Sequence, residues 1–181
     1  MSADLVGGGL LVAFGLLVTL LLWRRRRAVG PFIPWPSELR TAHLVHAERL
    51  FTAPGAMPIS ARVDRAYRVK SGGIVLLELK TREADRAYLS DVIELSAQRV
   101  ALGSQTGERV ADHAWVMVQR PGVESPGFHR VKLMPTTEVL ALAWRREAIL
   151  AGRSAPRYST SDRICGRCPF VRACERHGNS T

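Results

Sequence analysis

Cysteine is scarce in this sequence of 181 residues: there are three, all between positions 165 and 174. A scaffold built on disulfides needs cysteines in pairs along the chain, so that class of small secreted fold is excluded. The sequence also has no internal repeats, so a repeat array is excluded as well. An odd number of cysteines gathered in one short segment instead indicates that they bind a metal or a cluster.

Acidic residues are also in deficit, with 16 Asp and Glu against 26 Lys and Arg, which gives a net charge of +10. Four of the positive charges form one run, Arg24–Arg27, and the others are spread along the chain. Proteins with such a balance commonly meet a polyanion or an anionic membrane surface. The composition therefore favours nucleic acid or anionic lipid as a partner.

One long run without charge, Leu5–Trp23, occupies nineteen residues near the start of the chain. As a helix it would be roughly 28 Å long, close to the ~30 Å hydrocarbon core of a bilayer. No Lys or Arg precedes the run and Arg24–Arg27 follow it at once, which is unlike a cleaved signal peptide. We expect residues 1–27 to form a single transmembrane anchor in the cell inner membrane, with the rest of the chain in the cytoplasm.

The remaining chain predicts a linker, one domain and a tail. Residues 28–36 contain three prolines and are expected to form a stiff linker. A helix is expected over residues 37–51, because Ser37 is a good N-cap and leucines recur behind it. The later segments are expected in the order strand, strand, helix, strand, strand, helix, over residues 59–69, 74–80, 89–102, 113–119, 128–134 and 136–151. This order predicts a small α/β domain with a mixed central sheet over residues 37–153, followed by a cysteine-rich tail over residues 154–181.

Two carboxylates and a lysine fall on neighbouring predicted strands: Asp64 on the first, Glu78 and Lys80 on the second. Residues i and i+2 of a strand share a face, so Glu78 and Lys80 point the same way while Leu79 points into the core. Carboxylate oxygens bind hard cations such as Mg²⁺ or Mn²⁺, which polarise a phosphate and activate water. An ordinary surface pair of Glu and Lys would have the same spacing. The apolar context of Ile74–Leu77, the position of Asp64 across the hairpin and the cysteines of the tail together favour a metal site.

These residues resemble the PD-(D/E)xK nuclease superfamily, and specifically its RecB-type exonuclease branch, which includes a CRISPR-associated family. The matching segments are ARVDRAY at 61–67, IVLLELKTR at 74–82 and the helix around SAQR at 96–99. The resemblance implies a restriction-endonuclease-like core with Asp64, Glu78 and Lys80 as catalytic residues. It also implies that the Leu79 carbonyl joins the two carboxylates as a metal ligand, and that Gln98 contacts DNA or the lysine.

Two residues of the branch's pattern are absent from this sequence. Residues 52–63 contain no histidine, although the branch often carries one before the strand of the Asp. Ala101 and Leu102 stand where the branch has a tyrosine, one turn after the glutamine. These absences keep open a non-catalytic nucleic-acid-binding or scaffolding protein that retains the nuclease fold.

The three cysteines, Cys165, Cys168 and Cys174, have the spacing C-x2-C-x5-C. Three thiolates this close can bind one soft metal centre, but they need a fourth ligand. In the cluster-bearing members of the branch that this sequence resembles, such a trio closes a [4Fe–4S] cluster with a cysteine from the first helix, and His46 stands at that position here. His177 is a local alternative for the fourth ligand, and Zn²⁺ is an alternative to the cluster.

The sequence therefore predicts a membrane-anchored, divalent-metal-dependent nuclease that hydrolyses phosphodiester bonds in single- or double-stranded DNA. The arginines nearest to the signature in sequence are expected to meet the phosphates first, namely Arg62, Arg65, Arg82 and Arg86. A membrane-bound redox protein that uses the cysteine centre is a further alternative.

Overall fold

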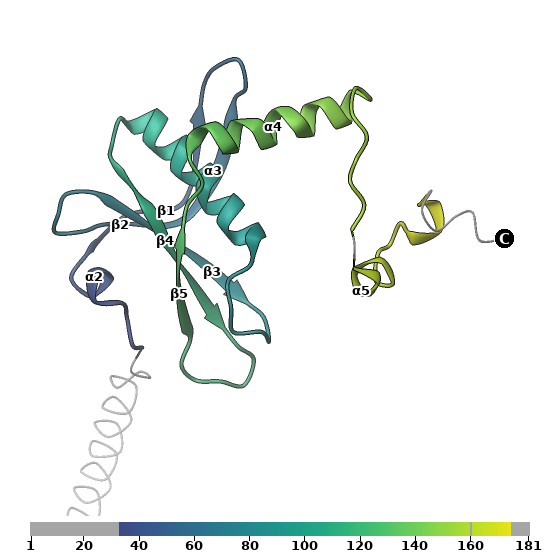
Figure 1. The fold of residues 1–181 in the computed structure, drawn as a ribbon. Coiled ribbons are helices and arrows are strands. Elements are labelled where there is room, and N and C mark those ends of the chain that lie inside the picture. Colours follow the sequence, from purple (N-terminus) through teal and green to yellow (C-terminus); the bar gives the residue numbers. More distant parts are fainter. Residues whose placement is uncertain (1–32, 160, 175–181) are drawn as a thin grey trace, which may run out of the picture. The chain divides into compact units, whose positions relative to one another are not determined.

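The computed structural model describes residues 33–159 and 161–174. They belong to two compact units, divided between Pro135 and Thr136. The described part of the first unit contains helices α2 and α3 and five strands, and Figure 1 labels these elements. Their bounds are α2 (Ser37–Arg40), β1 (His43–Ala53), β2 (Ile59–Arg68), β3 (Ile74–Thr81), α3 (Leu89–Thr106), β4 (Val110–Gln119) and β5 (Gly127–Lys132).

The five strands form one mixed sheet in the order β1-β2-β3-β4-β5. Strands β3 and β4 are parallel, and the other three neighbouring pairs are antiparallel. A parallel pair needs a crossover, and α3 supplies it between β3 and β4. The mixed sheet predicted from the sequence is therefore confirmed, and it is consistent with a restriction-endonuclease-like core.

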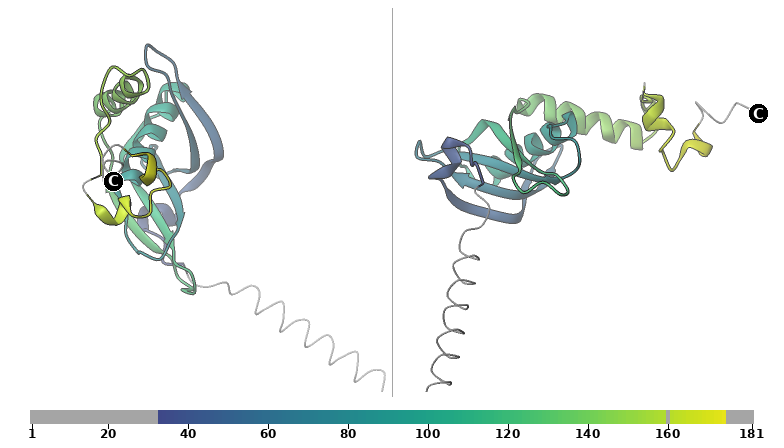
Figure 2. Two further views of the ribbon diagram at one scale, coloured as in Figure 1. Left: turned by 90° about the vertical axis from the view of Figure 1, so that its right-hand side faces the viewer. Right: turned by 90° about the horizontal axis from the view of Figure 1, so that it is seen from below.

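The core lies on both faces of the sheet, and β3 contributes to each. Ile74 and Leu76 of β3 belong to the larger apolar cluster, which includes Leu95 and Leu102 of α3. Val75 and Leu77 of β3 belong to a second cluster on the opposite face, which the short helix α2 closes with Leu39. A strand buried on both faces must be apolar throughout, which explains the run IVLL at residues 74–77. Figure 2 shows α3 lying along one face of the sheet.

The helix predicted over residues 37–51 is wrong: it stops at Arg40, and β1 begins at His43. The pairs that this segment forms with β2 run from His43 to Ala53, and Phe51 and Ala53 are buried two positions apart, as in a strand. Leu44 and Leu50, which were expected to form the apolar side of a helix, are 51% and 56% exposed. The segment is rich in residues that favour helices, but pairing with β2 outweighs that preference.

The second unit contains α4 (Thr136–Leu150), α5 (Asp162–Cys165) and the 3₁₀ turn η1 (Val171–Ala173). Helix α4 ends where Gly152 takes a φ of 68°, the left-handed conformation that glycine adopts without strain. The predicted anchor, residues 5–23, lies outside the described residues. Among the helices that are described, none is long and apolar enough to span a bilayer.

Candidate active site

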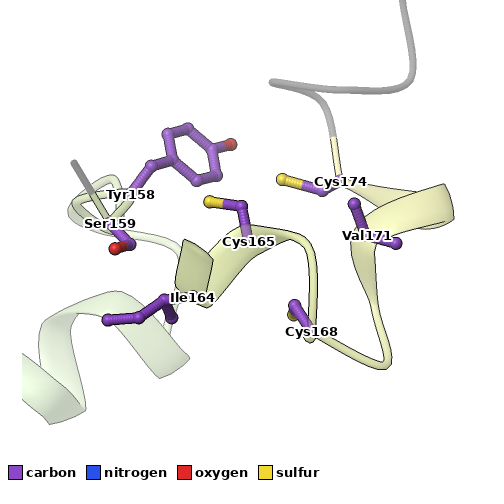
Figure 3. Close-up of a pocket in the computed structure, with 7 residues that line it drawn as sticks. All are labelled: Tyr158, Ser159, Ile164, Cys165, Cys168, Val171 and Cys174. Atoms are coloured by element: carbon purple, nitrogen blue, oxygen red, sulfur yellow. The ribbon is translucent and has the colours of Figure 1, made fainter. Parts of the chain in front are cut away.

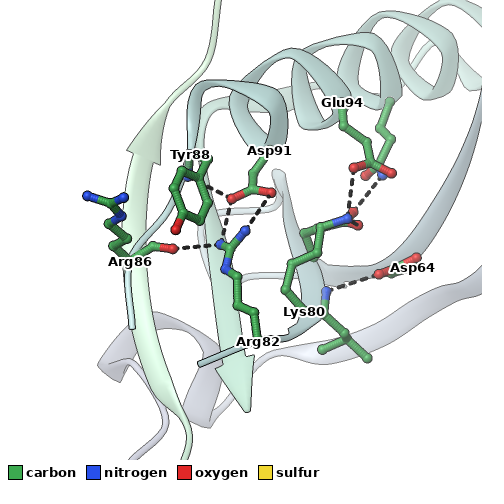
Figure 4. A network of polar contacts seen from close by, with 10 residues as sticks. Asp64, Lys80, Arg82, Arg86, Tyr88, Asp91 and Glu94 are labelled. Carbon is green, nitrogen blue, oxygen red and sulfur yellow. Dashed lines mark hydrogen bonds and ion pairs between the residues drawn. The ribbon is translucent and has the colours of Figure 1, made fainter. Parts of the chain in front are cut away.

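The candidate site lies where β2 and β3 separate. Their pairing runs from Arg68↔Ile74 to Arg65↔Leu77 and then stops. The next residues along the two strands are Asp64 and Glu78. Beyond the last pair, the N–H of Leu79 donates instead to Oδ2 of Asp64 at 3.0 Å (Figure 4). The Asp64 carboxylate thus takes the place of a missing strand partner at the opening of the sheet.

The strand alternation of β2 breaks around Asp64. Val63 and Ala66 both belong to the core cluster that contains the α3 leucines, although strict alternation would put them on opposite faces. On the neighbouring strand, Glu48 lies between the pairs formed by Ala47 and Arg49, and its φ is 49°. A non-glycine residue with positive φ is strained, and such strain is often found beside functional sites.

Glu78 is a buried carboxylate with two partners, as its side chain is 2% exposed. Its Oε1 lies 2.6 Å from the ammonium of Lys80, and its Oε2 accepts a hydrogen bond of 2.8 Å from Nε2 of Gln98. Glu78 and Lys80 therefore share a face of β3, as their spacing predicts. Leu79, between them, packs on the opposite face with Leu77.

Burial changes the acid–base properties of this pair. Removal from water raises the pKa of Glu78 to about 7, and the nearby negative charge of Asp64 adds to the effect, while the bonds from Lys80 and Gln98 oppose it. Burial acts against a charged lysine too, but the hydrogen bonds to Glu78 and Glu94 outweigh it and raise the pKa of Lys80. Lys80 therefore stays cationic at neutral pH, while Glu78 is close to its midpoint.

Glu94 is a member of the site that the sequence analysis missed. Its Oε2 lies 2.8 Å from the Lys80 ammonium, so the lysine is shared between a buried and a half-exposed carboxylate. The available signal was the spacing on α3: Glu94 comes four residues before Gln98, and residues four apart lie on the same side of a helix. Glu94 therefore adds one residue of α3 to the predicted site residues Asp64, Glu78, Lys80 and Gln98. Its spacing from Gln98 was the signal in the sequence that could have identified it.

The donor set fits a hard cation. Asp64 and Glu78 offer carboxylate oxygens, Leu79 offers a carbonyl, and oxygen donors of this kind are what Mg²⁺ and Mn²⁺ prefer. The negative charge of Asp64 contributes to the raised pKa of Glu78, which indicates that the two carboxylates lie near each other. Over residues 33–159 and 161–174, no group of three or more His, Cys, Asp or Glu side chains is arranged to hold a metal ion. The oxygen set here contains two such side chains, with the backbone as the third donor.

The predicted phosphate-binding arginines differ in how far they are engaged. The guanidinium of Arg62 donates to the carbonyl of Glu48 at 3.0 Å. That of Arg82 is paired with Asp91 at 2.7 Å, whereas Arg86 is exposed. Position in the sequence alone could not show which arginines are bonded within the protein and which one is exposed.

The three cysteines line one small cavity in the second unit, of about 120 Å³ (Figure 3). Tyr158, Ser159, Ile164 and Val171 complete its wall. His177 lies outside the described residues. His46 lies on β1 rather than on a helix, and its ring contacts that of Phe51 with centroids 5.0 Å apart.

Two comparisons with known proteins gave matches. The family model described as PD-(D/E)XK nuclease superfamily matches residues 9–175. A solved structure titled "Crystal structure of SSO0001" is similar, with 15% sequence identity and a TM-score of 0.47, over 90% of this chain and 71% of that chain. No curated protein matches the chain. The superfamily predicted from the sequence is thereby confirmed: this chain belongs to the PD-(D/E)XK nuclease superfamily.

Proposed function

We propose that the chain is a divalent-metal-dependent DNA nuclease of the RecB-type branch, which hydrolyses phosphodiester bonds. The observation that carries this proposal is the buried carboxylate of Glu78, held by Lys80 and Gln98 next to Asp64. A carboxylate taken out of water is costly to the fold unless cations compensate it. In a chain of this superfamily, a site that gathers such groups is best explained by chemistry on phosphate.

The carboxylates of Asp64 and Glu78, with the carbonyl of Leu79, would hold the cation. Asp64 bonds to the Leu79 N–H through Oδ2, which leaves its Oδ1 for a metal ion. When bound, Mg²⁺ or Mn²⁺ polarises the scissile phosphate and lowers the pKa of a coordinated water.

Lys80 and Gln98 would serve different purposes. Because its pKa is raised, Lys80 does not act as a base at neutral pH; it would orient the attacking water and stabilise the negative charge that develops on the phosphate. Gln98 is fully buried and donates to Glu78, so it would keep that carboxylate in one orientation. Glu94 holds the lysine in place until the substrate arrives.

A cleavage assay tests the proposal. The full chain, purified in detergent, is incubated with end-labelled single-stranded and duplex DNA in Mn²⁺. Cleavage is expected for the parent, and a loss of about a hundredfold or more for Lys80→Ala, which removes electrostatic stabilisation. Lys70→Ala is the matched control, because Lys70 is exposed in the turn before β3, at the opposite end of that strand. Equal cleavage by Lys80→Ala and the parent would contradict the proposal.

Binding without cleavage would support the alternative instead. A parent chain that binds DNA but leaves it intact in both Mg²⁺ and Mn²⁺ would be a nucleic-acid-binding or scaffolding protein. The absent histidine of residues 52–63 and the absent tyrosine at Ala101 and Leu102 are the features that favour this outcome.

We also propose that residues 1–27 anchor the domain to the inner membrane with the domain in the cytoplasm. The support is the uncharged run Leu5–Trp23 followed by Arg24–Arg27. The full chain is expected to stay in carbonate-washed membranes, and a chain that lacks residues 1–27 is expected to leave them. Cleavage of the domain by protease added to intact spheroplasts would contradict the orientation.

For the cysteine tail we propose a bound [4Fe–4S] cluster, with Zn²⁺ as the other candidate. The support is the C-x2-C-x5-C spacing of Cys165, Cys168 and Cys174 and the cavity that they line. In the described residues the three side chains are not arranged as a metal site, so a bound centre would need them to turn toward one another. Metal analysis and the visible spectrum of the purified chain separate the two centres, since a cluster absorbs near ~400 nm and zinc is colourless. Comparison of His46→Ala with His177→Ala identifies the fourth ligand, and loss of metal in neither variant would reject both histidines.

A further inference from the structure

Arg82 braces the loop between β3 and α3, residues 82–88. The backbone N–H of Arg82 donates to the carbonyl of Gln119 at 3.2 Å. Its guanidinium donates to both oxygens of Asp91, at 3.2 and 2.7 Å, and to the carbonyl of Arg86 at 2.6 Å (Figure 4). Arg82, which directly follows β3, thus ties the end of β4, the loop and the first turn of α3 together.

Asp91 balances the charge of Arg82. The residue is 2% exposed, and its Oδ2 also accepts the backbone N–H of Tyr88 at 2.7 Å. Burial opposes its ionisation, but the Arg82 guanidinium and the Tyr88 N–H outweigh burial and hold the pKa of Asp91 below its usual value. Arg82 is therefore engaged inside the protein, which differs from the phosphate contact expected from its position in sequence.

Arg86 differs from Arg82 in each of these respects. It is exposed, and no ion pair joins it to a carboxylate within the described ranges 33–159 and 161–174. Its guanidinium lies 4.7 Å from the centroid of the Tyr88 ring, and that of Arg82 lies 4.5 Å from the same centroid. Figure 4 shows the Tyr88 ring between the two arginine side chains.

We propose that Arg86 binds a backbone phosphate of the DNA next to the candidate active site, with Tyr88 as the residue that positions it. This inference rests on the proposed function, because it takes DNA as the substrate. A guanidinium has a planar set of donors that matches two phosphate oxygens. Stacking on Tyr88 holds that plane in advance, so less side-chain entropy is lost when the phosphate binds.

The position of the loop relative to the signature supports this assignment. Arg82 follows Lys80 by two residues, and Asp91 lies close enough to Lys80 for the lysine's charge to favour the ionised Asp91. Asp91 and Glu94, the lysine's partner, are both in the first turns of α3. Figure 4 shows Arg86 and Tyr88 on one side of Asp91 and the Lys80–Glu94 pair on the other. A DNA strand that runs from Lys80 along the N-terminal end of α3 would meet the guanidinium of Arg86, which has no carboxylate partner in the described part of the chain.

Binding is measured by fluorescence polarisation of a labelled single-stranded DNA with the full chain in detergent. Ca²⁺ replaces Mn²⁺, and a gel checks that the DNA stays intact. Arg86→Gln is expected to bind about tenfold more weakly, and the slope of log affinity against log salt should fall by about 0.7. Arg109→Gln is the matched control. Arg109 is an exposed arginine directly before β4, and it lies beside Gly73, the residue before β3. It is expected to bind within about twofold of the parent.

The Tyr88 variants test positioning separately. Tyr88→Phe keeps the ring and is expected to bind like the parent, whereas Tyr88→Leu should bind about two- to fivefold more weakly. Circular dichroism confirms that each variant is folded. The inference is overturned if Arg86→Gln binds like the parent, if Arg109→Gln loses as much, or if the parent binds no DNA.

Failure of the proposed function would look different. Cleavage is scored in the same samples after Mn²⁺ replaces Ca²⁺. A parent that binds through Arg86 but does not cut removes the nuclease assignment and supports the phosphate contact. A parent that cuts normally while Arg86→Gln binds and cuts equally well removes the phosphate contact alone.

Discussion

The buried carboxylate of Glu78 should make the stability of the domain depend on pH in a defined way. Its pKa of about 7 in the folded chain compares with an ordinary value of 4.5. The difference corresponds to about 3 kcal/mol of free energy of unfolding. We expect Glu78→Gln to remove this contribution, because the amide keeps the shape of the side chain without its charge.

The free energy of unfolding should fall as the pH rises, because Glu78 loses its proton at a lower pH in the unfolded chain than in the folded chain. Below pH 4.5, Glu78 is protonated in the folded and the unfolded chain, so the contribution to stability is fully present. Between pH 4.5 and about 7, the unfolded chain ionises before the folded one, and the free energy of unfolding falls. Above about pH 7 the contribution is lost, since both states are ionised.

The measurement compares the parent and Glu78→Gln by chemical denaturation of the full chain in detergent and EDTA. Tryptophan fluorescence reports unfolding, since Trp35 and Trp115 pack with the apolar cluster closed by α2. The free energy of unfolding of the parent minus that of the variant should fall by about 3 kcal/mol from about pH 4 to about pH 8. Groups common to both chains cancel in this difference.

Glu94→Gln is the control for the lost ion pair. It also removes a partner of Lys80, but its carboxylate is 49% exposed and already solvated. Its difference from the parent should change by less than about 1 kcal/mol over the same range. If the Glu78→Gln difference were the same at both pH values, the carboxylate would not be desolvated in the folded chain, and the reasoning would fail.

Three further predictions concern the same domain. Mn²⁺ should raise the thermal midpoint of the parent at about pH 8 and leave that of Glu78→Gln nearly unchanged, as seen by differential scanning fluorimetry. Gln98→Leu removes a buried hydrogen-bond donor to Glu78, so denaturation at about pH 8 should show a free energy of unfolding lower by about 1–3 kcal/mol than in the parent. The difference should shrink near pH 4, and a difference independent of pH would contradict this. In Gly127→Ala, the new Cβ would lie 2.0 Å from the Asp85 carboxylate, which pairs with His129 at 2.7 Å. Gly127→Ala should lower the free energy of unfolding by about 1 kcal/mol in the parent and by almost nothing in an Asp85→Ala background. Equal decreases in both backgrounds would exclude this clash as the cause.

Strand β3 and its charged residues were predictable because their causes are local. An apolar run of strand length indicates a strand buried on both faces, and the period of two puts Glu78 and Lys80 on one side. The position of Gln98 on the helix that crosses over from β3 to β4 was predictable in the same way. The contacts of these residues then follow from packing that one helix against the strand.

Strand β1 was not predictable by the same means. Its residues favour a helix in isolation, but they form a strand because they pair with β2. That pairing depends on a distant segment, so the sequence of residues 43–53 alone does not predict it. The roles of Arg82 and Arg86 were hidden for a similar reason. Both follow the signature closely, but only the docking of α3 brings Asp91 to one of them and leaves the other exposed.

The features that build β3 also set the chemistry of Glu78. The apolar residues that bury the strand exclude water from the carboxylate, so the same packing that stabilises the sheet raises the pKa of Glu78. The cost is limited by Lys80 and by the amide of Gln98, but these two partners do not cancel it, since the pKa stays well above its ordinary value. A residue buried at that cost is poised to bind a cation, because a second positive charge would remove the remaining penalty. On the proposed function, such a cation would bind beside β3 at the point where the pairing of β2 and β3 stops at Asp64.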